Sequence, residues 1–317
     1  MQQNSSMDKI APTVTLNNGK QMPILGLGTW MLRGGEAVET IKFAIDAGYR
    51  HFDTACYYRN EVEVGQAIRA KIAEGVIRRE DVFVTTKLLN SHHNPAHVEE
   101  AFQRSYDKLN IGYIDLYLMH SPFNFEFQSW EPQDLDANPK LASVDFVDTW
   151  RAMEKLLQTG KVRSLGVSNF NSEQLTRIVN ECQVKPVTNQ VECNPAINQR
   201  RLTAFCKDLN VTVTAYTPFG QLNDAKENAI NDPRVAEIAS KYSKTPTQIV
   251  LRYLVELGTI PIPKSANPKR IRENLEIFDF RLTEAEIQLM DSFNTGVRVW
   301  PFTFCVSSKY YPFNIEF

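Results

Sequence analysis

The feature that most constrains the fold is a regular alternation of short apolar runs with longer amphipathic segments, which begins near residue 24. The amphipathic segments have the 3.6-residue period of helices, and the apolar runs have the length and β-branched content of strands. We predict eight strands, at residues 24–27, 50–52, 82–86, 114–119, 162–167, 188–191, 211–215 and 259–262. Because parallel strands need helix-length connections and eight such units can close on themselves, the pattern predicts an α/β fold, the (β/α)8 TIM barrel.

An open, doubly wound sheet is the rival to a closed barrel. Such a sheet normally carries a G-x-G-x-x-G motif after its first strand. Gly26 and Gly28 match the first two glycines of that motif, but Met31 stands in the place of the third. No linker-like or low-complexity segment divides the chain, so we predict a single domain over residues 1–317, in which residues 1–12 form a flexible N-terminus.

Turn and capping signals locate further elements. An Asn-Gly turn at residues 17–19 predicts a β-hairpin before the first strand. Asn60 is the predicted N-cap of a helix, and Glu63 at the third helical position completes a variant of the capping box. Pro95 predicts the start of another helix. Later helices are predicted at residues 144–158, 172–180, 199–209 and 246–257.

Charge and cysteine usage exclude several classes of function. A net charge of −2 provides no basic field for nucleic acid or an anionic membrane. No stretch reaches the roughly 20 apolar residues that span a bilayer, and residues 1–15 lack the pattern of a signal peptide. The five cysteines form no C-x-x-C pair, as in proteins that keep their thiols reduced. We therefore expect a cytoplasmic protein. His93 and His97 lack a third ligand at matching spacing, so we predict no metal site.

Polar residues follow the apolar runs of seven of the predicted strands. In a (β/α)8 barrel the carboxyl ends of all strands form one face, where functional groups gather. The residues at these strand ends are Asp53, Lys87, His120, Ser168 with Asn169, Gln190, Tyr216 and Lys264. The sequence therefore predicts an active site at the carboxyl face of the barrel.

The types of these residues indicate proton transfer to an oxygen atom. Tyr58 lies five residues after Asp53, on the loop that leaves the second strand. Two unit charges about 4 Å apart interact by roughly 4 kcal/mol at an effective dielectric of 20, so a nearby Lys87 ammonium is expected to lower the pKa of Tyr58 by up to ~3 pH units. Tyr58 then becomes a usable general acid, with Asp53 orienting Lys87 and His120 bonding the substrate oxygen. This arrangement suits protonation of an oxyanion that forms as hydride reaches a carbonyl carbon.

A local basic cluster follows the last predicted strand. Lys264 and Ser265 are followed by Lys269, Arg270 and Arg272 in a chain that is otherwise near neutral. A proline at the start of the next helix predicts free backbone N–H groups at the same place. Lysine, arginine and serine side chains together indicate a phosphate-binding site.

Four segments resemble signature sequences of the aldo-keto reductase superfamily. The segments are residues 48–61, 114–120, 166–170 and 262–274. The spacings from Asp53 to Tyr58 (5), from Tyr58 to Lys87 (29) and from Lys87 to His120 (33) resemble those of the family's catalytic tetrad. The resemblance extends from about residue 13 to the C-terminus.

The resemblance implies a monomeric barrel that binds NADP(H) without a Rossmann domain, with its C-terminal tail over the active-site face. It also implies the cofactor contacts. The nicotinamide would be held by Ser168, Asn169, Gln190 and Tyr216, the 2′-phosphate by Lys264, Ser265, Asn267 and Arg270, and the adenine by Glu273 and Asn274. The implied reaction is the NADPH-dependent reduction of an aldehyde or ketone, with Tyr58 donating the proton.

The substrate pocket departs from the family pattern. Leu89 and Ser121 stand where many relatives have aromatic residues, which predicts a pocket less walled by aromatic rings. Five residues are candidates for lining the pocket: Trp30, Ser121, Phe123, Trp300 and Phe302. Small hydrophobic aldehydes and bulky ketones both fit the pattern, and we favour a bulky ketone such as a steroid, ecdysteroid-like ones included.

Two other functions are compatible with a barrel of this kind. One is a non-catalytic regulatory barrel that binds the cofactor without turnover. The other is a lyase that forms a Schiff base through Lys87, because barrels also host lysine aldolases. In such a lyase, the phosphate-binding site predicted after the eighth strand would have no purpose.

Overall fold

Eight parallel strands form one sheet, as the sequence predicts. The computed structural model describes residues 10–132, 139–220 and 228–317, so most of the N-terminus that we predicted to be flexible lies outside the described residues. The sheet order is β12-β11-β10-β9-β6-β5-β4-β3. The strands are β3 (Leu27–Gly28), β4 (His51–Asp53), β5 (Phe83–Leu88), β6 (Leu116–Met119), β9 (Leu165–Ser168), β10 (Thr188–Glu192), β11 (Thr212–Tyr216) and β12 (Thr259–Pro261).

The two edges of this sheet meet, which closes the barrel. The backbone N–H of Gly26 donates to the carbonyl of Pro261 (3.0 Å), and that of Gly28 donates to the carbonyl of Pro263 (3.1 Å). A Cβ at Gly28 would lie 2.8 Å from the carbonyl oxygen of Ile262, so this close approach requires glycine. The predicted (β/α)8 barrel is confirmed.

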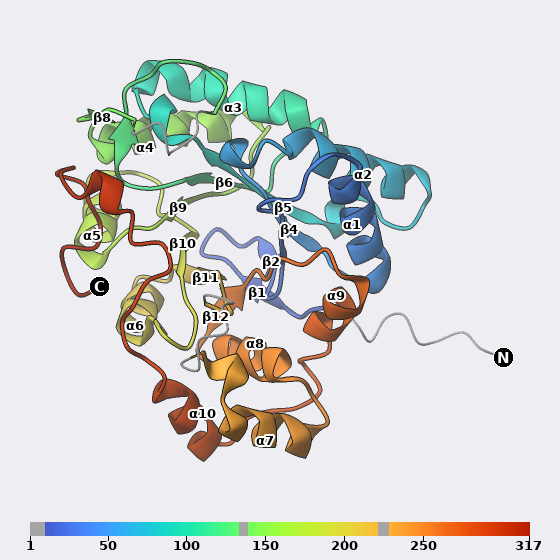
Figure 1. Cartoon of the computed structure of the whole chain (residues 1–317). Helices are drawn as coiled ribbons and strands as arrows, with labels where there is room; N and C mark the ends of the chain where they lie inside the picture. The colour runs from blue at the N-terminus through green and yellow to red at the C-terminus, as the bar shows by residue number, and fades with distance from the viewer. Residues whose placement is uncertain (1–9, 133–138, 221–227) are drawn as a thin grey trace.

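Helices surround the strands (Figure 1). Those between consecutive barrel strands are α1 (Gly34–Ala47), α2 (Glu61–Ala73), α3 (Pro95–Leu109), α4 (Phe146–Leu156), α5 (Ser172–Glu181), α6 (Arg200–Asp208), α7 (Pro233–Tyr242) and α8 (Pro246–Glu256). Two more follow the last strand, α9 (Pro268–Leu275) and α10 (Glu284–Asp291). Their apolar sides and the outer faces of the strands form one large core.

The helix predictions were correct in position but incomplete. The capping box predicted at Asn60 is wrong, because the Asn60 side chain instead accepts from the Thr54 hydroxyl (2.6 Å) and donates to the carbonyls of Thr29 and Leu32. Asn60 therefore ties loops at the carboxyl face together. Helices α7 and α10 were missed, although each begins after a capping residue, Asp232 and Thr283.

The predicted N-terminal hairpin closes the amino end of the barrel. Its strands β1 (Thr13–Thr15) and β2 (Gln21–Pro23) pair antiparallel. Leu16 and Met22 are buried against inward-facing side chains of the barrel strands, among them Phe83 and Leu118. The amino end is therefore filled with apolar side chains, and the carboxyl end remains for the site.

The C-terminal segment crosses the carboxyl face, as predicted, and is fastened there to α5 and its N-cap. The side chains of Asn171 and Gln174 donate to the carbonyls of Pro312 and Tyr310 (3.0 Å each). A small hairpin that we did not predict, β7 (Asn124–Phe125) with β8 (Leu141–Ala142), lies on the loop after β6. These two segments form walls above the strand ends.

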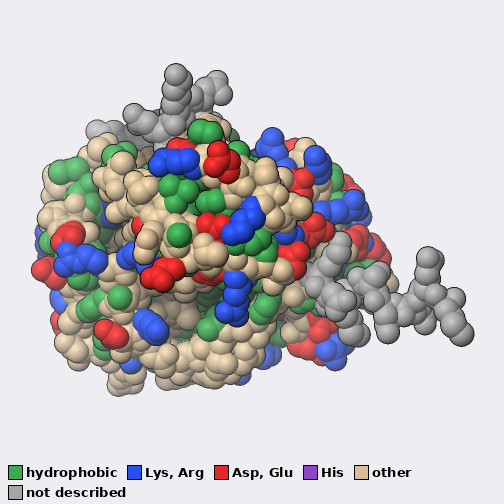
Figure 2. Space-filling view, turned by 90° about the horizontal axis from the view of Figure 1, so that it is seen from below, with side chains coloured by type: hydrophobic (Ala, Val, Ile, Leu, Met, Phe, Trp, Pro, Cys, Tyr) green, Lys and Arg blue, Asp and Glu red, His purple; other side chains and the backbone are tan. Residues whose placement is uncertain are grey.

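Side chains of both signs are interspersed on the face seen in Figure 2, in keeping with the net charge of −2. No helix in the described part of the chain is long and apolar enough to cross a bilayer.

Candidate active site

Asp53, Lys87 and Tyr58 form a hydrogen-bonded chain at the carboxyl ends of β4 and β5. The Nζ of Lys87 donates to Asp53 Oδ1 (2.5 Å), to the carbonyl of Thr54 (2.9 Å) and to the hydroxyl of Tyr58 (3.2 Å). Gln190, from β10, donates to the other carboxylate oxygen of Asp53 (2.8 Å). Lys87 and Asp53 are almost fully buried, so this ion pair is rigid and shielded from water.

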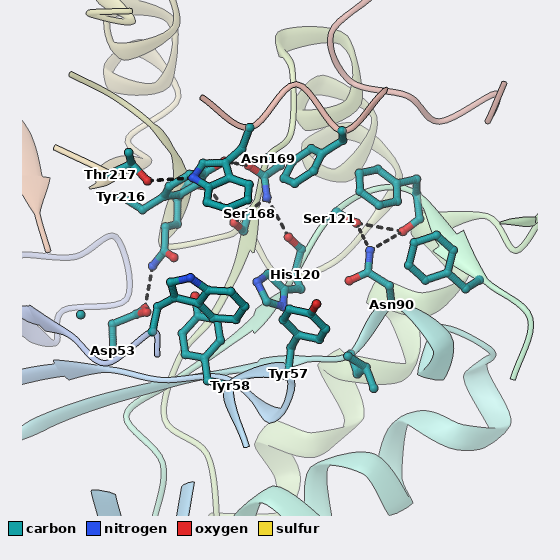
Figure 3. Close-up of a pocket in the computed structure, with 18 of the residues that line it drawn as sticks. Asp53, Tyr57, Tyr58, Asn90, His120, Ser121, Ser168, Asn169, Tyr216 and Thr217 are labelled. Atoms are coloured by element: carbon teal, nitrogen blue, oxygen red, sulfur yellow. Dashed lines mark hydrogen bonds between the residues drawn. The ribbon is translucent and has the colours of Figure 1, made fainter. Parts of the chain in front are cut away.

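His120 follows β6 and stands beside Tyr58 (Figure 3). The two rings meet edge to face, with centroids 5.9 Å apart. No described residue forms a hydrogen bond with a ring nitrogen of His120, and none accepts the hydroxyl hydrogen of Tyr58. Both groups line the same cavity. A proton donor and a second polar group are therefore available to one ligand oxygen.

Burial determines the protonation states of this group. It raises the pKa of Tyr58 well above its ordinary value, with a further contribution from the negative charge of Asp53. Our expectation of a lowered phenol pKa is therefore wrong, because burial of the phenol raises its pKa and the charge of Asp53 offsets that of Lys87. Burial and the positive charge of Lys87 hold the pKa of His120 well below its ordinary value, so the imidazole is neutral.

The residues predicted to contact the nicotinamide line the cavity opposite Tyr58. The hydroxyl of Tyr216 donates to Asn169 Oδ1 (2.7 Å), and Asn169 Nδ2 donates to the carbonyl of His120 (3.0 Å). Ser168 donates to the carbonyl of Gln190 (2.8 Å). Asn169 has φ of 63°, a left-handed conformation that asparagine tolerates better than most residues. These bonds fix the Tyr216 ring as a flat wall of the cavity.

The basic segment after β12 lies at the same end of the barrel. Lys264 lines the cavity, and Arg270 is exposed on the first turns of α9. Within the described residues neither cation forms an ion pair, so both are available to a phosphate group. Arg272, by contrast, lies over the ring of Phe43 at 4.8 Å, and Lys269 pairs with Glu273 (3.6 Å).

The start of α9 differs from the prediction. Asn267 is the N-cap, and its side-chain oxygen accepts from the backbone N–H groups of Lys269 and Arg270. The sequence predicted that these N–H groups would be free, but they are already bonded to Asn267. Ser265 is buried and accepts from the backbone N–H of Asn267 (3.1 Å). Asn274 is also buried, farther along the helix. The cationic side chains, rather than the helix end, are the groups that fit a phosphate.

A cavity of about 400 Å³ opens above the strand ends. It contains all five predicted lining residues: Trp30, Ser121, Phe123, Trp300 and Phe302. It is also lined by aromatic residues that we missed, namely Tyr57, Phe125, Phe219 and Phe304. The small hairpin and the C-terminal segment therefore supply aromatic rings where the strand ends carry Leu89 and Ser121. The alternation Phe123-x-Phe125 and Phe302-x-Phe304 is a sequence signal that could have identified two of them.

Glu192 at the end of β10 was not predicted as a site residue. Its side chain is fully buried and accepts from the backbone N–H groups of Val299 (2.7 Å) and Trp300 (2.9 Å). Trp300 also donates from its indole nitrogen to the Thr217 hydroxyl (3.2 Å). Glu192 therefore anchors the C-terminal wall of the cavity to the barrel.

Comparison with known proteins agrees with this geometry. The sequence matches the Aldo/keto reductase family over residues 24–295. Aldo-keto reductase family 1 member A1-A of Danio rerio is 42% identical over 293 residues, which cover 90% of each chain. The solved structure of Bombyx mori aldo-keto reductase AKR2E4 in complex with NADP has a TM-score of 0.88 at 40% identity, over 96% of this chain and 99% of that one. The aldose reductase from Schistosoma japonicum has a TM-score of 0.90 at 37% identity, with the same coverage of 96% and 99%.

Fold and site together define a class, the oxidoreductases that use NADP(H) on a (β/α)8 barrel. Within that class the chain belongs to the aldo/keto reductase family. The sequence-based prediction of NADPH-dependent carbonyl reduction is confirmed for the reaction type and the cofactor.

Proposed function

We propose that Tyr58 is the general acid of this reductase and that Lys87, Asp53 and His120 support it. Lys87 holds the Tyr58 hydroxyl oxygen as a hydrogen-bond acceptor, which leaves the phenol hydrogen directed to a ligand. Burial lowers the pKa of Lys87, and Asp53 opposes this effect and holds the ammonium in place. His120, neutral at physiological pH, offers a ring N–H to the same ligand oxygen and positions the carbonyl.

One observation carries this proposal. Tyr58 Oη and the ring of His120 lie at the cavity floor with hydrogen-bonding atoms that no described residue uses, next to the Lys87–Asp53 ion pair, whose hydrogen bonds are all made within the protein. When bound, NADPH supplies the hydride that reduces the carbonyl carbon. The chain then supplies the proton: the Tyr58 phenol transfers it to the carbonyl oxygen, and the Lys87 ammonium stabilises the phenolate left behind.

We propose the family's cofactor contacts for the matching residues of this chain. Ser168, Asn169, Gln190 and Tyr216 would hold the nicotinamide, Lys264, Ser265, Asn267 and Arg270 the 2′-phosphate, and Glu273 and Asn274 the adenine. Lys264 and Arg270 form no ion pair with any residue that the structure describes, and this supports the phosphate assignment most directly. A 2′-phosphate would pair with both positive charges. NADH lacks this phosphate and would leave the two cations without a partner.

The walls of the cavity support a bulky, largely apolar carbonyl substrate. The nicotinamide would fill part of the volume of about 400 Å³, and the remaining part, walled by aromatic rings, suits the apolar surface of a polycyclic ketone better than a small aldehyde. Steroid-like ketones, ecdysteroids among them, are the class we favour.

The lyase alternative loses support from the environment of Lys87. All three hydrogens of its ammonium are used, and its side chain has no exposed surface. A nucleophilic amine must be free and reachable by the substrate. We also propose a monomer in the cytoplasm, and the five free cysteines are in keeping with a reducing compartment.

A panel of carbonyl compounds, followed by NADPH absorbance, tests the proposed function. We expect NADPH oxidation matched one for one by alcohol, fastest with polycyclic ketones. Binding of NADPH without turnover of any compound would instead identify the regulatory barrel. Borohydride trapping of a ketone on Lys87 would identify the lyase.

A further inference from the structure

A polar pair of residues interrupts the apolar wall of the cavity. Asn90, just after β5, and Ser121, just after His120, meet there. The amide nitrogen of Asn90 donates to the Ser121 hydroxyl oxygen and to the carbonyl of Phe123 (3.1 Å). The Ser121 hydroxyl donates to the same carbonyl (2.9 Å). Neither residue takes part in the proposed proton transfer.

These contacts fix the orientation of the Asn90 amide. Its nitrogen faces two acceptors, and the reversed amide would place its oxygen against the carbonyl of Phe123. The oxygen, Oδ1, therefore lies on the other side and points toward Tyr57, across the cavity (Figure 3). No residue of the described chain donates a hydrogen bond to it.

An open acceptor among apolar groups favours a ligand that carries a donor. The lining of the cavity includes Leu89, Phe123, Phe125 and Phe302, which offer no side-chain hydrogen bond, and the hydroxyl of Tyr57, from which Asn90 Oδ1 accepts no hydrogen bond in this structure. A bulky ketone that displaced water from this wall would leave Asn90 Oδ1 unsatisfied unless it carried a donor there or the Tyr57 hydroxyl turned to it. Carboxylates and further carbonyls are disfavoured, because they present a second acceptor to the same oxygen.

We propose that Asn90 Oδ1 is a specificity-determining acceptor for a hydroxyl group on the substrate. The enzyme then prefers hydroxylated apolar ketones to their deoxy analogues. The inference rests on the proposed reduction of bulky ketones and goes one step beyond it, to the functional group that the substrate carries in addition to its carbonyl.

The test uses pairs of polycyclic ketones with the same skeleton and the same reacting carbonyl, with or without one hydroxyl at varied positions. We expect at least one hydroxylated ketone to have a kcat/KM roughly tenfold above that of its deoxy partner, mainly through KM. Asn90→Leu should abolish this preference and leave reduction of the deoxy ketone intact. Asn90→Ala provides the same test if leucine is not accommodated.

Asn18 offers a matched control at the opposite end of the barrel. It too donates to a serine hydroxyl, that of Ser164 (2.9 Å), and to a backbone carbonyl, that of Arg163 (3.3 Å). Asn18→Leu should leave the hydroxyl preference unchanged. If both ketones of every pair are reduced and no preference for the hydroxylated one depends on Asn90, this inference alone is overturned. Failure to reduce any of the ketones would overturn the proposed function as well.

Discussion

At the scale of single residues, the site combines an ion pair whose hydrogen bonds are all made within the protein with two groups whose hydrogen-bonding atoms remain available to a ligand. Lys87 donates to Asp53 and to the carbonyl of Thr54, and Asp53 also accepts from a fixed glutamine of β10. Tyr58 and His120, by contrast, face the cavity with hydrogen-bonding atoms that no described residue uses. The residues could be identified from sequence, because their spacing and positions at strand ends carry the signal. Their pKa values could not, because desolvation depends on the packing of the whole barrel.

The pKa directions predict how the rate depends on pH. The pKa of Tyr58 is raised, so the phenol stays protonated and able to donate as pH rises through neutrality. The pKa of His120 is lowered, so the imidazole is neutral over the same range. We expect kcat for ketone reduction to be nearly constant between about pH 6 and 8. Alcohol oxidation, which needs the phenolate, should accelerate as pH rises.

Initial rates in both directions across this range provide the measurement. If the reduction rate instead falls as pH rises through the ordinary histidine pKa, a protonated His120 is required, which contradicts this account.

At the scale of elements, the loop from β12 into α9 is expected to select the cofactor. Arg270→Met removes a cation that we assign to the 2′-phosphate, so NADPH should bind about 10- to 100-fold more weakly while NADH changes little. Fluorescence titrations with both cofactors measure the ratio. Arg272→Met is the matched control, because this arginine lies on Phe43 and should not alter the ratio. Equal weakening of NADPH and NADH by Arg270→Met would remove the assignment.

The C-terminal segment is expected to act as a wall that Glu192 holds in place. Glu192→Gln keeps the shape of the side chain but weakens the bonds to the N–H groups of Val299 and Trp300. We expect a several-fold higher KM for bulky ketones, with NADPH affinity unchanged.

Steady-state kinetics with bulky and small carbonyls test this expectation. Glu154→Gln is the control, because Glu154 also accepts from two backbone N–H groups, those of Gln183 and Val184, but far from the cavity. An identical KM for bulky ketones in Glu192→Gln and wild type would mean that the segment holds its place without Glu192.

Elements differ in how far local sequence determines them. The eight strands were predicted at the right places because each is short, apolar and bounded by turns. The aromatic lining was underestimated, since Phe125 and Phe304 reach the cavity only through contacts between distant segments. Asn60 misled for a related reason: its side chain satisfies carbonyls of a neighbouring loop instead of its own helix.

At the scale of the whole molecule, the barrel separates stability from chemistry. The hairpin closes the amino end with buried side chains, and the site occupies the carboxyl end. Met22→Ala removes a fully buried side chain from the closed end, so the free energy of unfolding should fall by about 2–5 kcal/mol while kcat is unchanged. Denaturant unfolding and kinetics below the transition measure the two effects. A proportional loss of kcat in folded protein would show that the two ends are coupled.

The central claim is that the Tyr58 phenol donates the proton during carbonyl reduction, and Tyr58→Phe tests it most directly. The measurement is kcat for ketone reduction together with NADPH affinity, and Tyr106→Phe, which removes a hydroxyl from the outer surface of α3, is the control. The account predicts that Tyr58→Phe lowers kcat by about 10²- to 10⁴-fold with NADPH affinity retained, while the control matches wild type. A kcat equal to that of wild type in Tyr58→Phe would contradict it.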